Sequence, residues 1–385
     1  MKIILLGAGH IGHAIARLLH ASGDYDLIAA DRDAHALATI EALGVRTALI
    51  DFKDHDALCG LLSGNDACLN ALPYHMATAV AKAAKMSGVH YFDLTEDVRA
   101  TRAIAKLAAG ADTAFMPQCG LAPGFIGIAA HHLAHDFDEI HELKMRVGAL
   151  PEFPTNELKY NLTWSVDGLV NEYCHPCEAI RDGKMQDIQP LEGLEHFSLD
   201  GVEYEAFNTS GGLGTLCNTL AGKVRNLDYK SVRYPGHRNL VKFLLEELRL
   251  RDDQEQLKAI LRKSVPATMQ DVVLVFVTVS GMRRGQYVQE VFSRKIFART
   301  SADGVHESAN ESAIQITTAA GICAALDLFR EGRLPARGFI RQEQIALPDF
   351  LANRYGRVYG AGVFVGSQQR PLVPRDQVKE AVLAD

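Results

Sequence analysis

The sequence predicts an α/β protein in which a doubly wound parallel sheet is followed by a second, α+β domain. Three observations predict it: strand-like and helical segments alternate up to about residue 120, a glycine-rich turn follows the first strand, and strand-like segments then succeed one another. Strands separated by single helices form parallel βαβ units, whereas successive strands form antiparallel or mixed sheets. With 385 residues, 48% of them hydrophobic, the chain is long enough for two or three domains.

In the first third, each strand is a short apolar run and each helix repeats apolar residues every three to four positions. The predicted strands are Lys2–Leu6, Leu27–Ala30, Arg46–Ile50, Ala67–Ala71, Tyr91–Leu94 and Thr113–Met116. The predicted helices between them are Ile11–Leu19, Ala34–Leu43, Asp54–Leu62, Tyr74–Met86 and Asp97–Ala109. This alternation predicts a parallel sheet with a helix after each strand.

After about residue 121, the strand-like segments lack regular helices between them. They are Leu143–Val147, Lys159–Trp164, Val202–Phe207, Val272–Ser280 and Gln289–Phe297, with a hairpin turn predicted at Gly281–Gly285 between the last two. The predicted helices of this part are Arg238–Leu248, Gln254–Arg262 and Ser312–Phe329. We expect an antiparallel or mixed sheet here, and an irregular tail after Pro348.

Composition excludes several classes of function. The formal net charge of −7 argues against a nucleic-acid surface, which needs clustered Lys and Arg. The longest apolar runs, such as Val272–Val279, are far short of the roughly 20 residues that span a bilayer. Glycines interrupt the N-terminal apolar run, so we expect no targeting segment. Seven cysteines, an odd number, are typical of reduced thiols, and we expect a cytoplasmic protein.

The glycine-rich turn is a G-x-G-x-x-G motif, and its members are Gly7, Gly9, His10, Ile11 and Gly12. Between a strand and a helix, such glycines let the backbone approach a pyrophosphate, which the helix N-terminus then binds. Asp31, about 20 residues further on, is placed to accept hydrogen bonds from the adenosine ribose. The pattern predicts a Rossmann domain that binds NAD. The adjacent Arg32 keeps NADP as the alternative, and Asp51 follows the third strand of the same site.

Five strings in order resemble the saccharopine dehydrogenase superfamily, and within it the lysine 6-dehydrogenases. The strings are Asn70–Tyr74, Gly88–Thr95, Cys119–Gly124, Leu162–Ser165 and Val232–His237. The resemblance implies a Rossmann domain, residues 1–120 and 310–350, with an inserted substrate-binding and dimerisation domain at 121–309. It also implies a homodimer through the sheet of that second domain.

The resemblance implies an NAD-dependent amino-acid dehydrogenase. Its reaction would oxidise the ε-amine of L-lysine to 2-aminoadipate 6-semialdehyde, which cyclises to piperideine-6-carboxylate. Fungal saccharopine reductases carry an arginine where this chain has only small or apolar residues, Asn208–Leu213. Without that clamp the extra carboxylates of saccharopine would be unpaired, so a smaller substrate is favoured, unless Arg225 or Arg233 replaces it. The alternatives are a saccharopine dehydrogenase or reductase and a non-catalytic dinucleotide-binding protein.

Amine oxidation requires a base, because the nitrogen lone pair must assist hydride loss. Asp93 and Glu96 follow the fifth strand, where ligands bind in doubly wound sheets, although acids there also cap helices. His237 is the predicted base, with helix capping as the alternative. Arg233 is the predicted partner of the substrate carboxylate, because a guanidinium binds it with two hydrogen bonds.

The remaining candidates follow from the matched strings. Trp164, the only tryptophan, is expected to line the substrate pocket, and Thr163, its neighbour along the predicted strand, to face the opposite way. The other predicted substrate-binding residues are Tyr160, Asn208 and Thr209. The other predicted cofactor-binding residues are Ala71, Leu72, Pro73, Thr95, Cys119, Gly120 and Pro123.

We expect no metal. Cys174–Cys177 is a single C-x-x-C without a second pair to complete a zinc site. His131 and His135 share a helix face, but no glutamate completes a metal-binding motif.

Overall fold

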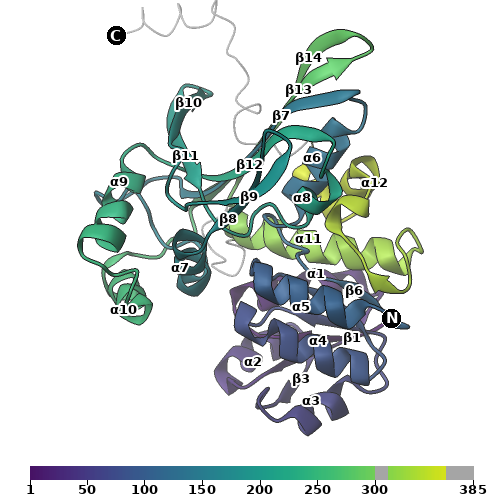
Figure 1. The fold of residues 1–385 in the computed structure, drawn as a ribbon. Helices are drawn as coiled ribbons and strands as arrows, with labels where there is room; N and C mark the ends of the chain where they lie inside the picture. Colours follow the sequence, from purple (N-terminus) through teal and green to yellow (C-terminus); the bar gives the residue numbers. More distant parts are fainter. Residues whose placement is uncertain (300–310, 361–385) are drawn as a thin grey trace, which may run out of the picture.

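The computed structural model describes residues 1–299 and 311–360, and it contains two sheets joined by one long helix (Figure 1). The first is a fully parallel, seven-stranded sheet with the strand order typical of a Rossmann domain. Its strands, in spatial order, are β15 (Gly338–Phe339), β6 (Ala114–Met116), β5 (His90–Asp93), β4 (Ala67–Asn70), β1 (Lys2–Leu6), β2 (Asp26–Asp31) and β3 (Arg46–Leu49). The predicted α/β fold class is confirmed. The predicted domain limits at residues 309 and 310 lie outside the described residues.

Helices cover both faces of this sheet because its strands are apolar on both sides. Ile3 and Leu5 of β1 pack on one face, whereas Ile4 and Leu6 pack on the other. The first face carries α1 (His10–Ser22), α2 (Ala34–Glu41) and α11 (Ala313–Arg330). The second face carries α3 (His55–Leu62), α4 (Ala77–Met86) and α5 (Val98–Ala108), and the short η1 (Tyr74–Met76) precedes α4.

The second sheet has eight strands and is mixed rather than purely antiparallel, since β12 and β7 run parallel. Its main path is β10 (Glu195–Leu199), β11 (Val202–Asn208), β12 (Val224–Arg233), β7 (Glu139–Pro151), β13 (Asp271–Arg283) and β14 (Gln286–Phe297). The hairpin β8 (Cys177–Arg181) and β9 (Lys184–Ile188) joins through β12. Alternate valines of β13 pack against α6 (Phe125–Ala134).

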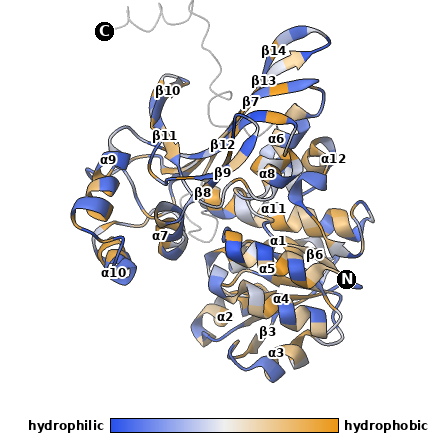
Figure 2. Ribbon diagram, viewed as in Figure 1, coloured by the Kyte–Doolittle hydropathy of each residue, from blue (hydrophilic) through white to orange (hydrophobic). Residues whose placement is uncertain are grey.

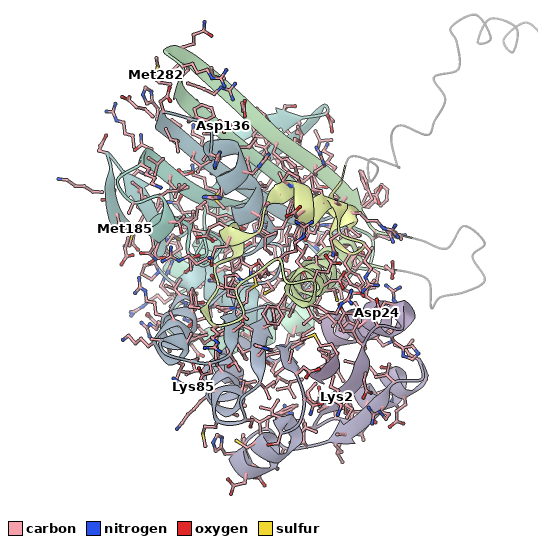
Figure 3. The ribbon with its side chains drawn as sticks, turned by 90° about the vertical axis from the view of Figure 1, so that its right-hand side faces the viewer. Lys2, Asp24, Lys85, Asp136, Met185 and Met282 are labelled. Atoms are coloured by element: carbon pink, nitrogen blue, oxygen red, sulfur yellow. The ribbon has the colours of Figure 1, made fainter. Side chains whose placement is uncertain are left out.

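The predicted hairpin of β13 and β14 is confirmed, but its turn is shorter than predicted. Arg283 pairs with Gln286, which leaves Arg284 and Gly285 as a two-residue turn. Both turn residues have positive φ, at 52° and 77°, as the tight hairpin turns that match strand twist require. Met282 near this turn lies at the top of Figure 3, whereas Lys2 at the start of β1 lies in the lower half.

Three predicted segments differ in the structure. Lys159–Trp164 is not a strand: it has one isolated bridge, from Leu162 to Ala267, and Asn156 bonds its backbone instead. The helix predicted at Arg238–Leu248 is divided into α9 (His237–Lys242) and the π-helical turn η2 (Phe243–Glu247). The tail predicted to be irregular after Pro348 contains most of α12 (Leu347–Ala352) and all of η5 (Gly356–Tyr359), and η4 (Gln342–Gln344) lies just before it. Helix α10 (Gln254–Ser264) agrees with its prediction, whereas α7 (Val166–Cys174) and α8 (Leu216–Thr219) were not predicted.

Helix α11 lies between the two sheets and belongs to the core of both (Figure 1). It is the one described helix that is long and apolar enough to cross a membrane, but most of it is buried inside the protein. Figure 2 shows orange residues along this helix. Asp271, the first residue of β13, accepts hydrogen bonds from the Ala313 and Ile314 N–H groups at 2.5 and 3.0 Å. The second sheet therefore caps the helix that packs on the first sheet.

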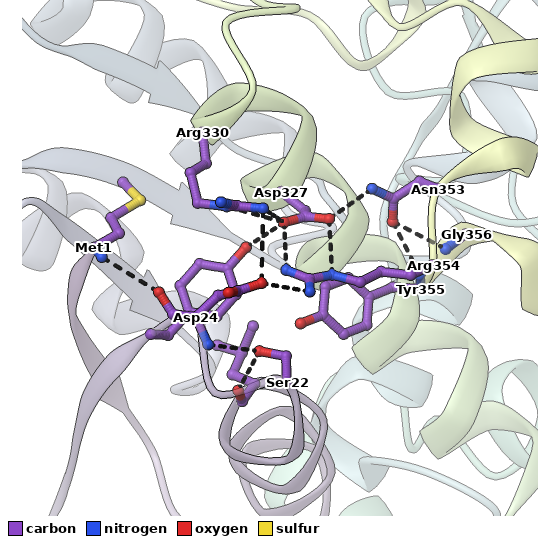
Figure 4. A network of polar contacts seen from close by, with 11 residues as sticks. Met1, Ser22, Asp24, Asp327, Arg330, Asn353, Arg354, Tyr355 and Gly356 are labelled. Carbon is purple, nitrogen blue, oxygen red and sulfur yellow. Dashed lines mark hydrogen bonds and ion pairs between the residues drawn. The ribbon is translucent and has the colours of Figure 1, made fainter.

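A polar network fixes the other end of α11 (Figure 4). Asp327 is buried and accepts hydrogen bonds from Tyr25 at 2.6 Å, Arg354 at 2.8 Å and Asn353 at 2.8 Å. Burial favours the protonated acid, but these donors outweigh it and lower the pKa of Asp327 to about 2. The ionised carboxylate thereby links the α1–β2 connection, α11 and the segment after α12.

Candidate active site

The glycine turn after β1 has the shape that a dinucleotide requires. Gly7 has a φ of +105°, and a Cβ there would lie 2.9 Å from the Ala71 carbonyl oxygen. A Cβ on Gly12 would lie 1.9 Å from the Gly7 carbonyl oxygen, so both positions exclude side chains. A Cβ on Gly9 would meet no atom within 4 Å, and no side chain caps α1. The N-terminus of α1 is therefore open to a pyrophosphate from the Gly9 side, and these residues fit a dinucleotide.

Asp31 is held in place by the same turn. Its Oδ2 accepts the Ala8 N–H at 2.6 Å and its Oδ1 accepts the Asp33 N–H at 3.0 Å. Arg32 beside it is exposed. Asp51 is also exposed after β3, where its Oδ1 accepts the Lys53 N–H at 3.0 Å. The turn thus fixes the orientation of Asp31, while Arg32 extends into solvent.

Asp93 organises the loops at the carboxyl edge of the sheet. Its Oδ1 accepts the N–H groups of Thr95 at 3.0 Å and Gln118 at 2.8 Å, and its Oδ2 accepts the Tyr91 hydroxyl at 2.7 Å. Burial raises the pKa of Asp93 to about 6 despite these bonds. Because both oxygens have protein partners, the structure favours a positioning role for Asp93 over the predicted contact with substrate.

A second chain of bonds continues from Asp93 to the loop after β4. The Tyr91 hydroxyl receives a bond from Asn70 Nδ2 at 3.1 Å, and Asn70 Oδ1 accepts the Leu72 N–H at 3.1 Å. Ala71 and Leu72 are partly buried and Pro73 is exposed. The predicted cofactor residues after β4 are therefore fixed to the loop after β5.

The Cys119 loop is buried. The thiol contacts the Met116 carbonyl oxygen and Gln342 Nε2, each at 3.0 Å, and burial raises the pKa of the thiol well above its ordinary value. A Cβ on Gly124 would lie 2.1 Å from the Gly120 carbonyl oxygen, and Pro123 is buried beside them. Cys119 is thus a protonated, enclosed thiol and no nucleophile.

Glu96 lies where the two halves of the chain meet. A Cβ on Gly168 of α7 would be 2.4 Å from the Trp164 ring and 3.3 Å from Glu96 Oε1. A Cβ on Gly211 would be 2.5 Å from the Glu96 carbonyl oxygen. Burial, with the nearby Asp97 adding to it, raises the pKa of Glu96 to about 7. A carboxyl group with this pKa can accept and release a proton near neutral pH.

Arg233, at the end of β12, is buried against aromatic rings. Its guanidinium lies 5.1 Å from the centre of the Tyr160 ring, and its Nε donates to the Tyr173 hydroxyl at 3.0 Å. Among the described residues, no carboxylate forms an ion pair with it, and its Nη2 has no hydrogen-bond partner. A buried cation without an anion is costly, so this geometry favours an anionic ligand, as predicted for the substrate carboxylate.

The surroundings of His237 argue against its predicted role as the base. One ring nitrogen, Nδ1, bonds the Leu158 carbonyl oxygen at 2.8 Å, and Nε2 lies 3.1 Å from the Tyr173 hydroxyl. Burial and the charge of Arg233 lower the pKa of His237 to about 3. A neutral imidazole with both nitrogens bonded positions Tyr173 and through it Arg233.

Thr163 and Trp164 do not face opposite ways as predicted, because their segment is not a strand. Both lie close enough to the Tyr160 hydroxyl to lower its pKa, which burial raises. The Tyr160 hydroxyl and Thr163 Oγ1 are nevertheless buried without a hydrogen-bond partner. Two unpaired hydroxyls near Arg233 are polar atoms that the protein leaves unsatisfied, and such atoms call for an explanation that a polar ligand beside them would supply.

The strand register places Asn208 and Thr209, the other two predicted substrate-binding residues, on opposite faces of the sheet. Asn208 pairs with Lys230, whereas Arg233 pairs with Glu205, so Asn208 points to the opposite face of the sheet from Arg233. Its Nδ2 donates to the Gln189 carbonyl oxygen at 3.1 Å. Thr209 lies on the Arg233 face but bonds Ser231 at 2.7 Å. The structure therefore argues against substrate binding by Asn208.

The structure also locates Arg225, the alternative partner for the carboxylates of saccharopine, and shows how the possible metal ligands are distributed. Arg225 is exposed and pairs with Asp182, about 26 Å along β12 from Arg233, so it is not a clamp for this site. In the two described parts of the chain, no group of three or more metal-ligating side chains comes together.

The sequence patterns missed the residues of α7. Gly168 and Glu172, spaced i and i+4, share one face of this helix with the Trp164 ring and Glu96. The spacing is visible in the sequence, but the helix itself was not predicted, and without it no pattern connects Glu172 to Arg233.

Two family models together match most of the chain. Residues 3–115 match the saccharopine dehydrogenase NADP binding domain, and residues 120–358 match the saccharopine dehydrogenase C-terminal domain. Saccharopine dehydrogenase (NADP+, L-glutamate-forming) of Saccharomyces cerevisiae is 24% identical over 272 residues, 66% of this chain and 60% of that protein. The mitochondrial alpha-aminoadipic semialdehyde synthase of Rattus norvegicus is 23% identical over 199 residues, 49% of this chain and 21% of that protein. The chain thus spans less than two thirds of these relatives.

The fold is also similar to a solved structure. Apo histidine-tagged saccharopine dehydrogenase (L-Glu forming) from Saccharomyces cerevisiae superimposes with a TM-score of 0.76 at 17% identity, covering 92% of this chain and 98% of that chain. The matched NADP binding domain supports a nicotinamide dinucleotide as the cofactor of the glycine turn. Because the two family models cover both sheets and the helix between them, the chain belongs to the saccharopine dehydrogenase family.

Proposed function

We propose that the protein is a nicotinamide-dependent dehydrogenase that oxidises the ε-amine of L-lysine. The observation that carries the proposal is the buried Arg233, which has no ion-pair partner among the described residues; it lies near Glu172, which in turn lies near Glu96, and both of these carboxyl groups have raised pKa values. An amino acid brings a carboxylate for the guanidinium and ammonium groups for the carboxylates. The edge of the Rossmann sheet, where Glu96 lies, is where a dinucleotide reacts.

The proposed chemistry divides between the cofactor and the chain. A nicotinamide dinucleotide, when bound along Gly7–Gly12 and the loop after β4, supplies the hydride acceptor. Arg233 binds the substrate carboxylate and sets the distance to the reacting carbon. Glu96, with its pKa near neutrality, accepts the proton from the ε-ammonium so that the lone pair assists hydride loss. Water then hydrolyses the resulting imine to the semialdehyde and ammonia. Trp164 and Tyr160 exclude bulk water from this space.

Saccharopine is the second candidate substrate, favoured by the names of the relatives. It carries more carboxylates than lysine, and each would need a cationic partner when buried. On the α7 side of the second sheet, Arg233 is the buried cation that the described residues leave without an acid. Arg146 and Lys230 lie on the other face and pair with Glu195. This distribution of charge favours lysine.

The experiment is a substrate comparison. The protein is incubated with NAD or NADP and either L-lysine or saccharopine, and the absorbance of the reduced cofactor is followed. Reduction with lysine and release of ammonia support the proposal. Reduction with saccharopine alone would assign the second function, and tight cofactor binding without turnover of either would make the protein a non-catalytic dinucleotide binder.

A further inference from the structure

Glu172 is a buried carboxyl group that has no role in the proposed reaction. It lies on α7, is 5% exposed, and receives neither a hydrogen bond nor an ion pair on its side chain from any residue that the structure describes. A buried acid without a partner is costly, and such groups in native structures call for an explanation.

The surroundings of Glu172 show which space it faces. Its charge acts on one cation, one carboxyl group and several aromatic or thiol groups: Arg233, Glu96, Tyr160, Tyr173, Tyr229 and Cys177. These residues come from β12, the loop after β5, the segment before α7, α7 itself, and β8. Glu172 therefore faces the same space as the unpaired Tyr160 hydroxyl and the free Nη2 of Arg233.

An α-amino acid carries its carboxylate and its ammonium on one carbon. Arg233 and Glu172 offer the two complementary charges, and they form no ion pair with each other, so both charges are left for a zwitterion. Resting on the proposed function, we propose that Glu172 binds the α-ammonium of the substrate and thereby selects α-amino acids over simple amines. Glu96, on the Rossmann side of Trp164, is then left for the ε-amine.

The test compares L-lysine with 6-aminohexanoate, which has the same ε-amine and carboxylate but no α-amino group. In the Glu172→Gln variant we expect kcat/KM for L-lysine to fall about 10- to 100-fold, as for loss of a charge-assisted hydrogen bond. We expect kcat/KM for 6-aminohexanoate to change less than about threefold. Glu172→Asp should restore part of the preference for lysine, and the exposed Glu157→Gln serves as the matched control.

A binding measurement keeps the test independent of turnover. Burial raises the pKa of Glu172 to about 8, with Glu96 adding to it and Arg233 opposing it, so the free site is largely protonated at pH 7. Binding an α-ammonium should release that proton, which calorimetry of L-lysine binding to the protein–NADH complex, where no hydride can be accepted, detects in buffers of different ionisation enthalpy. Glu172→Gln should abolish the release.

Equal losses for both substrates would make Glu172 part of the catalytic machinery and overturn the inference, as would an unchanged preference for lysine. If the wild-type protein turns over neither substrate, the proposed function fails, whereas proton release on binding lysine still decides the role of Glu172. The Gln side chain has the shape of the protonated acid, so the variant is expected to fold.

Discussion

The Gly168→Ala substitution tests the placement of Trp164 and Glu96 in the proposed active site, because it adds one methyl group beside them. The new Cβ would lie 2.4 Å from Trp164 Cζ3, 2.9 Å from Cη2 and 3.3 Å from Glu96 Oε1. Ordinary carbon contacts are about 3.5 Å or longer, so the indole must move by about 1 Å. Misplacement of that size at a reacting centre costs about 100-fold in rate. We therefore expect kcat/KM for L-lysine to fall about 100-fold.

The assay has a built-in probe, because Trp164 is the only tryptophan of the chain. We expect the emission of Gly168→Ala to shift toward that of an exposed indole, while the Kd for NAD stays within about twofold. The glycine turn that binds the cofactor is a separate element, so the loss should appear in the steps that involve the substrate. Crowding of the indole should lower the free energy of unfolding by about 1–3 kcal/mol, partly offset by the gain in helix propensity of about 0.5–1 kcal/mol, so unfolding is measured beside kcat/KM.

Gly127→Ala is the matched control. Gly127 is also buried in a helix, α6, but its Cβ would meet nothing within 4 Å. The same chemical change should leave kcat/KM and the fluorescence unchanged there. A Gly168→Ala enzyme with wild-type kcat/KM would refute the placement of Trp164 and Glu96 at the reacting centre.

Three further predictions follow from individual residues. Asp327→Asn should lower the free energy of unfolding at pH 7 by about 1–2 kcal/mol, because the pKa of Asp327 falls from 3.8 to about 2 on folding; urea titrations should show the difference above pH 4 and its loss as pH falls toward 2. His237→Gln should leave the pH profile of kcat/KM in place, and a shifted profile would restore His237 as the base. Asp31→Ser should lower the ratio of kcat/KM with NAD to kcat/KM with NADP about tenfold or more, because Asp31 repels a 2′-phosphate; an unchanged ratio would remove Asp31 from the choice of cofactor.

The Rossmann half could be predicted from the sequence because its signals are local. Each strand and helix has its own periodicity, and Asp33, Asp54 and Asp97 cap the helices that follow them. The exception is β15, two residues long, whose pairing with β6 depends on the return of the chain after α11. So short a strand has no pattern of its own.

The substrate half was harder to predict because its site depends on contacts distant in sequence. The strand-like run Lys159–Trp164 is apolar at alternate positions, yet side chains such as Asn156 take the backbone bonds that a ladder would use. His237 had the right residue type for a base, but burial beside Arg233 removes its proton affinity. Neither effect can be recognised before the neighbours across the fold are known.

The segment Asn208–Leu213 lacks a basic residue, and its small residues are also required for packing. A Cβ on Gly212 would lie 2.3 Å from the Tyr229 ring, and one on Gly211 would lie 2.5 Å from the Glu96 carbonyl oxygen. The loop therefore fills the space between the two halves with backbone alone, and a larger residue would push Glu96 or Tyr229 out of place. Glu96 acts electrostatically on Glu172, and Glu172 and Arg233 act on Tyr229, so the loop packs against residues that adjoin the proposed substrate site. An arginine at Gly211 or Gly212 could not be accommodated without displacing Glu96 or Tyr229, and this packing adds to the charge argument for the proposed smaller substrate.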